Sequence, residues 1–182
     1  MRRDVARTRS MIFKAYLELL FQNEGKKITV NDVIEKADVS RGTFYAHFKD
    51  IPDLGEQMED RIVSVCHELI SARPPQEMII NPESAVSACL DIFMQYQDEL
   101  RIISQNGKSP AILYKLKELI RDSIMQYAED LFGREQSLIL SACVSGAVVD
   151  SCIAWIINDE GIDREELVRE VSSFISRGMS GL

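Results

Sequence analysis

Apolar residues recur at helical spacing along almost the whole chain. Near the start, Ile12, Tyr16 and Leu20 follow one another every four residues, as on one face of a helix. No stretch alternates polar and apolar residues between turn residues in the way a half-buried strand does. The pattern therefore predicts an all-α protein.

Capping residues and helix breakers divide this pattern into eight predicted helices. Thr29, Ser40 and Asp50 are typical N-cap residues, and Gly25 and Gly133 are typical of positions just after a helix. The predicted helices cover about residues 6–23, 29–37, 40–48, 50–73, 82–105, 109–132, 134–158 and 163–178.

The segment from Leu138 to Ile157 carries a single charged residue, Asp150, and has the length of a membrane span. Serines and Gly146 dilute it, and a central aspartate costs about 2.5–3.5 kcal/mol on insertion. A helix buried on all sides in a soluble oligomer explains the same pattern, so we expect no membrane span. Asp150 then needs a cation across a subunit boundary, a cationic ligand group, or water.

Composition and charge indicate an ordinary globular protein with an uneven charge distribution. The 182 residues are 46% hydrophobic and 27% charged, with a net charge of −8. Residues 1–49 have a net charge of +4, whereas residues 50–182 have −12. A basic head on an acidic body predicts that only the head meets a polyanion.

The four cysteines are Cys66, Cys89, Cys143 and Cys152, and none forms a C-x-x-C pair. All lie in apolar stretches, and the chain does not start with a secretory signal, so we expect buried, reduced thiols in an intracellular, cytoplasmic protein. A redox switch is the alternative.

The most informative stretch runs from Ile28 to Leu54. Two short helices joined by a tight turn at residues 38–40 predict a helix-turn-helix. On the second of these helices, Phe44 and Phe48 anchor one face, and hydrogen-bonding residues project from the other. Such a helix suits insertion into the major groove of DNA.

This stretch resembles the DNA-binding domain of the tetracycline-repressor (TetR) family of bacterial regulators. The family pattern is roughly T-V-x-x-I-A-x-x-A-G-V-S-x-G-x-[FL]-Y-x-[HY]-F, and the matching residues are Thr29, Val30, Ala37, Val39, Ser40, Gly42, Phe44, Tyr45, His47 and Phe48. The close match covers about residues 9–54; beyond them only the length and the helical layout agree. The resemblance implies a DNA-binding domain at 1–50 and a regulatory and dimerisation domain at 51–182.

Three residues depart from the family pattern. Asp38 replaces the usual turn glycine, and aspartate tolerates left-handed backbone better than most residues. Ile34 replaces a small alanine and asks for a different packing distance. Ile51 replaces a lysine that commonly touches a phosphate in the family, so this contact is expected to be lost.

By resemblance, two sets of residues contact DNA. Phosphate contacts are expected from Thr29, Tyr45, His47 and Lys49, and base contacts from Ser40, Arg41, Gly42 and Thr43. An arm with Arg2, Arg3, Arg7 and Arg9 reaches the minor groove or the backbone, or is a solvated tail.

The resemblance also implies a small-molecule effector bound in the C-terminal body. Candidate pocket residues are Cys66, Phe93, Tyr96, Tyr127 and Cys143, with ordinary core packing as their alternative. Helices at about 134–158 and 163–178 are expected to form a homodimer, which presents two heads to a palindromic operator. Two alternatives remain: a body that senses a protein partner, and a helical interaction module that does not bind DNA.

Nothing in the sequence indicates an enzyme. It has no glycine-rich phosphate loop, nucleophile elbow or H-E-x-x-H motif, and its two histidines, His47 and His67, do not have metal-ligand spacing. We therefore expect no catalytic residues, no metal and no cofactor.

Overall fold

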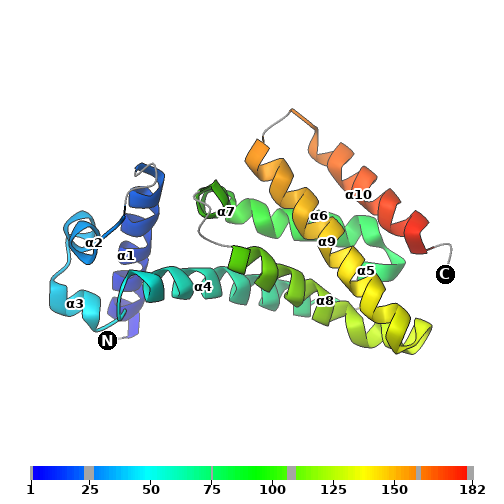
Figure 1. The fold of residues 1–182 in the computed structure, drawn as a ribbon, viewed down its shortest axis with the longest axis horizontal. Helices are drawn as coiled ribbons and strands as arrows, with labels where there is room; N and C mark the ends of the chain where they lie inside the picture. Colours follow the sequence, from blue (N-terminus) through cyan, green and yellow to red (C-terminus); the bar gives the residue numbers. More distant parts are fainter. Residues whose placement is uncertain (1, 23–26, 75, 106–109, 159–160, 180–182) are drawn as a thin grey trace.

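The computed structural model describes residues 2–22, 27–74, 76–105, 110–158 and 161–179, and within them every regular element is a helix (Figure 1). The all-α prediction is confirmed. The helices are α1 (Arg2–Gln22), α2 (Val30–Ala37), α3 (Arg41–Tyr45), α4 (Ile51–Ser71), α5 (Glu77–Ile80), α6 (Pro82–Gln95), α7 (Gln97–Gln105), α8 (Pro110–Phe132), α9 (Arg134–Asn158) and α10 (Arg164–Met179).

Several predicted boundaries are wrong. The first helix begins at Arg2 rather than near residue 6, and α3 ends at Tyr45 rather than near residue 48. The short helix α5 lies between the predicted helices at 50–73 and 82–105, where none was expected. The predicted helix at 82–105 is broken at Tyr96, whose φ of −121° and ψ of 23° are not helical. Asp98 and Glu99 lie in the first turn of the next helix, where acidic residues favour a helix start.

Figure 1 shows α1, α2 and α3 grouped at one end of the molecule, with α4 leading from them into a helical body. In the body α8 packs on α4, α9 packs on α8, and α10 packs on α6 and α9. One buried apolar cluster continues from Ile12 in α1 to Ile175 in α10. In the head, the Phe13 and Phe48 rings meet edge-on, with centroids 5.4 Å apart. Shared apolar packing therefore connects the head to the body.

The turn between α2 and α3 is built on Asp38, which adopts a left-handed conformation with φ 51° and ψ 50°. Its backbone N–H donates to the Glu35 and Ile34 carbonyls, and the Val39 N–H donates to the Ile34 carbonyl over 3.1 Å. These bonds satisfy the last carbonyls of α2. The expectation that aspartate preserves this turn is confirmed.

We expect Asp38→Gly to raise the free energy of unfolding by about 0.5–1 kcal/mol, because glycine adopts a positive φ without strain. Asp38→Val is the control and should lower it, since a β-branched side chain is strongly disfavoured there. Urea unfolding followed by circular dichroism measures both. A glycine variant less stable than the parent would contradict this account of the turn.

Three of the four cysteines are buried, as predicted. Burial raises the pKa of Cys66 to about 11 and that of Cys89 to about 12, and it also raises the pKa of Cys152. These thiols stay protonated and unreactive at neutral pH. The prediction is wrong for Cys143, which is exposed on α9.

The structure also answers the question of Asp150. Its carboxylate forms an ion pair with Lys117 of α8, at 2.7 Å, and its side chain is 59% exposed. The cation therefore comes from the same chain.

Within the described residues, α9 is the one helix that is both long enough and apolar enough to cross a membrane. Half of its most apolar window is buried inside the fold. Packing in the core of the fold explains why that half is apolar.

Candidate nucleic-acid interface

The start of α2 is held by a reciprocal cap. The Thr29 hydroxyl accepts from the Asp32 backbone N–H, and the Thr29 backbone N–H donates to the Asp32 carboxylate over 2.8 Å. The Thr29 hydroxyl also donates to that carboxylate, and these bonds lower the pKa of Asp32. Thr29 is exposed beside this helix start, but its hydroxyl already has partners within the chain.

Two serine and threonine hydroxyls build the start of α3. The Ser40 side chain accepts from the Thr43 backbone N–H at 3.0 Å, and the two hydroxyls are 2.8 Å apart. The predicted cap at Ser40 is confirmed. Both side chains therefore stabilise the start of α3, in addition to the base contacts expected of them. Gly42 lies between them, and a Cβ there would meet only open space and the Ser40 hydroxyl.

Burial separates the two faces of the segment that follows. Phe44 and Phe48 are buried, at 0% and 1% exposure, and their ring centroids are 5.7 Å apart. Tyr45 and Lys49 are exposed, whereas His47 is half-buried with its ring near that of Phe48. The sequence therefore correctly separated the anchor residues from the outward face.

Sequence reasoning missed Asn31, which lies exposed on α2. The Arg41 guanidinium donates a hydrogen bond to its side-chain oxygen. This contact joins the two helices of the motif across ten residues of sequence and restrains a long side chain. Asn31 is a solvent-facing polar residue of α2, but only the crossing of α2 and α3 shows that it meets Arg41.

The start of α4 is tied to α1 by a polar network. Asp50 caps α4, and the Asp53 carboxylate accepts from the Lys49 backbone N–H over 2.7 Å, which lowers the pKa of Asp53. Gln57 bonds to Asp53 and accepts from Arg9 over 2.8 Å. These bonds fix the orientation of α4 against α1.

Residues 2–9 are helical, so the segment that carries the four arginines is the start of α1 and not a tail. Its contact with the minor groove or the DNA backbone stays a prediction. The Arg9 guanidinium lies 5.3 Å from the Phe48 ring centroid and 5.6 Å from that of Phe13. Such contacts favour an arginine that packs within the head. Arg7 is exposed on α1, and the side chains of residues 2 and 3 lie outside the described part.

The five candidate pocket residues lie in different surroundings. Cys66 and Phe93 are buried in the core, and Tyr127 is half-buried on α8. Tyr96 lines a cleft beside α1 and α4, whereas Cys143 lines a groove between α9 and α10. The described part of the chain therefore does not bring Tyr96 and Cys143 into one pocket.

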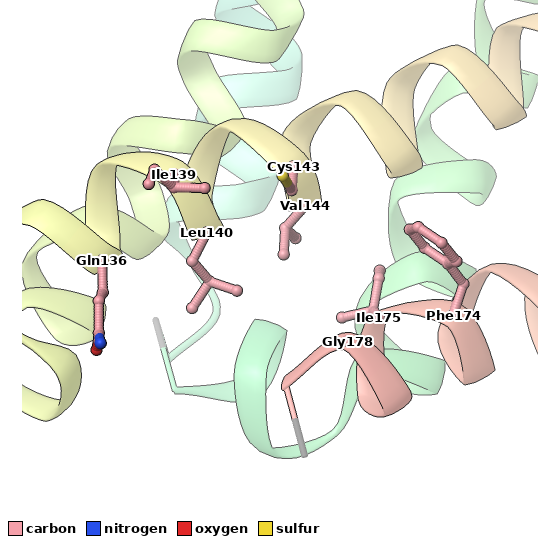
Figure 2. A pocket seen from close by; sticks show the side chains of 8 residues that line it. All are labelled: Gln136, Ile139, Leu140, Cys143, Val144, Phe174, Ile175 and Gly178. Atoms are coloured by element: carbon pink, nitrogen blue, oxygen red, sulfur yellow. The ribbon is translucent and has the colours of Figure 1, made fainter. Parts of the chain in front are cut away.

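The groove between α9 and α10 has a volume of about 310 Å³ and an apolar lining (Figure 2). The residues that line it are Gln136, Ile139, Leu140, Cys143, Val144, Phe174, Ile175 and Gly178. Ile139 and Phe174 at its edges are 69% and 67% exposed. A helix pair with this much exposed apolar surface is typical of an interaction site.

Comparison with known proteins identifies the head. Residues 12–58 match the family model of bacterial regulatory proteins of the tetR family. The chain is 21% identical over 175 residues to YxbF, an HTH-type transcriptional regulator of Bacillus subtilis strain 168. That match covers 95% of this chain but 46% of YxbF, so the chain spans about half the length of this curated relative.

Two solved structures share the fold. One, a TetR-family regulator from Syntrophomonas wolfei, superposes with a TM-score of 0.78 at 20% identity and covers 97% of both chains. The other, a TetR regulator from Streptococcus agalactiae 2603V, gives a TM-score of 0.66 at 21% identity over 96% of both chains. The matched proteins are transcriptional regulators and not enzymes, in agreement with the sequence-based prediction.

Proposed function

We propose that this chain, a DNA-binding transcriptional regulator whose head belongs to the TetR family, is a repressor that binds a palindromic operator as a homodimer and releases it when a small molecule binds. The observation that carries the proposal is the division of the α3 segment. Phe44 and Phe48 hold it on the core, while Arg41, Gly42 and Tyr45 face outward. An exposed helix held in this way matches what major-groove entry requires.

The proposed contacts divide into two sets. Tyr45 and Lys49, both exposed, hold phosphates together with His47 and the start of α2 at Thr29. Arg41 reads a base edge, and the open space at Gly42 lets the backbone of α3 approach the DNA closely. The Ser40 and Thr43 hydroxyls are hydrogen-bonded to each other, and they contact bases through their remaining donor and acceptor positions. We place the boundary between head and body at residues 50 and 51, where α4 begins.

The proposed dimer forms through α9 and α10. Ile139 and Cys143 of α9 and Phe174 of α10 are exposed around the groove in Figure 2, and a second copy of the same surface would cover them. A two-fold axis at this surface places two heads on one face of the DNA. Such a regulator works in the cytoplasm without a cofactor, and α9 packs in the dimer rather than in a membrane.

Two alternatives make different predictions. If the body senses a protein partner, operator affinity will respond to that protein and to no small molecule. If the chain is an interaction module, the purified protein will enrich no DNA sequence. Selection of random duplex DNA at near-physiological salt, on protein confirmed to be a dimer, tests the proposal. A palindromic consensus is the expected result, and its absence would contradict an operator-binding role.

We expect Lys49→Ala and Tyr45→Phe to weaken binding to all DNA sequences alike, because phosphate contacts carry no sequence information. Loss of the Lys49 charge should also reduce the salt slope of binding by about 1. Lys36→Ala is the matched control, since its ammonium pairs with Glu18 on α1. Fluorescence anisotropy with operator and random duplexes measures these effects. A variant that loses operator binding alone would contradict the assignment to phosphates.

A further inference from the structure

A cleft of about 270 Å³ lies where α1, α4 and the break between α6 and α7 meet. Buried Phe13, Met58 and Ile62 contribute apolar surface, and Tyr96 at the break closes one side. A second cleft, of about 640 Å³, runs on between α1 and α7. The two share the lining residues Lys14, Leu17 and Glu99, so they form one trough between the head and the body.

One end of this trough contains two cations without an acidic partner. Among the described residues, neither Lys14 nor Arg61 has a carboxylate oxygen within 4 Å, and the Arg61 guanidinium lies 5.8 Å from the Phe13 ring centroid. Glu18, one turn from Lys14, pairs instead with Lys36 at 3.0 Å. Glu99 lines the same cleft but forms an ion pair with neither cation. An anionic group placed between the two cations would form charge-assisted hydrogen bonds with both.

The other end of the trough has an apolar strip along α1, bordered by the polar lining residues Glu18, Gln22, Asp98, Glu99 and Arg101. Leu17 and Phe21 of α1 face Ile102 of α7 across the second cleft, and Phe21 is 72% exposed. Phe21 lies seven positions after Lys14, which is about 10 Å along the helix. A medium-length hydrocarbon chain fits this distance and would cover the exposed Phe21 ring.

We propose that the trough binds a medium-chain amphiphile with one anionic head, either a carboxylate or a phosphate monoester. Its head lies between Lys14 and Arg61, and its tail runs over Leu17 and Phe21. Because α1 belongs to the head and α7 to the body, the ligand contacts both and favours one arrangement of the two. This names the effector class of the proposed function and rests on that function for its effect on DNA.

Calorimetric titration of the full chain with octanoate and with octyl phosphate tests the site. We expect both probes to bind and octylammonium, which has the opposite head charge, not to bind. Lys14→Met and Arg61→Met keep an apolar stem and remove one charge, and each should weaken octanoate binding by about tenfold. Arg169→Met on α10, whose side chain is exposed outside the trough, is the matched control and should bind as the parent does.

Octylammonium binding equal to octanoate binding, or unchanged octanoate affinity in Lys14→Met, would overturn the site. The regulatory role is tested separately by operator affinity at saturating octanoate, which should fall in the parent and stay constant in Lys14→Met. Octanoate binding with no change in the parent's operator affinity would overturn that role. A parent protein that binds no DNA without ligand would instead refute the proposed function, and the titration would still decide the site.

Discussion

Ile139→Asp is expected to convert the protein to a monomer and to weaken operator binding by at least about a hundredfold. Ile139 is 69% exposed at the edge of the groove between α9 and α10. In a two-fold dimer each substitution acts in both subunits, so two carboxylates would be taken out of water without a cation. The expected loss is large because dimerisation makes binding of the second head intramolecular, which multiplies affinity by about 10² to 10⁴.

The control for this substitution is Tyr114→Asp. Tyr114 is also a large exposed residue, at 63%, but it lies near the start of α8 and does not line the groove. Both variants gain the same charge, so a general electrostatic repulsion of DNA would affect them equally. Light scattering measures the mass in solution, circular dichroism confirms the fold, and anisotropy measures operator affinity. A dimeric Ile139→Asp variant with parental affinity would refute the proposed interface.

Local chemistry explains why much of the head was predictable. Thr29, Ser40 and Asp50 cap helices through bonds to residues three positions on, so a short stretch of sequence contains the whole interaction. The four-residue spacing of Phe44 and Phe48 likewise places both on one face without knowledge of the rest of the fold.

The misses depend on tertiary structure. The apolar pattern continues from α6 into α7, so the break at Tyr96 has no signal in periodicity. In α9 nearly every side is apolar, and the exposed side that includes Ile139 and Cys143 is defined only by where α8 and α10 pack. The trough at Lys14 and Arg61 joins residues from different helices, and its two cations are informative only once their surroundings are known.

Arg41→Ala is expected to weaken operator binding by about 1–3 kcal/mol and to relax sequence preference at a single operator position in each half-site. The guanidinium is exposed on α3, and one of its N–H groups bonds to Asn31. Arginine has five donors, so this bond leaves a free edge that can pair bidentately with guanine. Asn31 thus restrains the side chain in advance of binding.

A double-mutant cycle separates the two roles. If Asn31 acts through Arg41, Asn31→Ala will weaken operator binding by less than Arg41→Ala does. Added to Arg41→Ala, it will cause no further loss of operator affinity. Lys36→Ala is the control, because it removes a cation from the side of α2 that faces Glu18. It should leave the sequence preference at that operator position unchanged. Binding to operators altered at single positions measures the change. An Arg41→Ala protein that loses affinity equally for every sequence would place Arg41 on a phosphate, and base reading would then have to come from Thr43 or the backbone at Gly42.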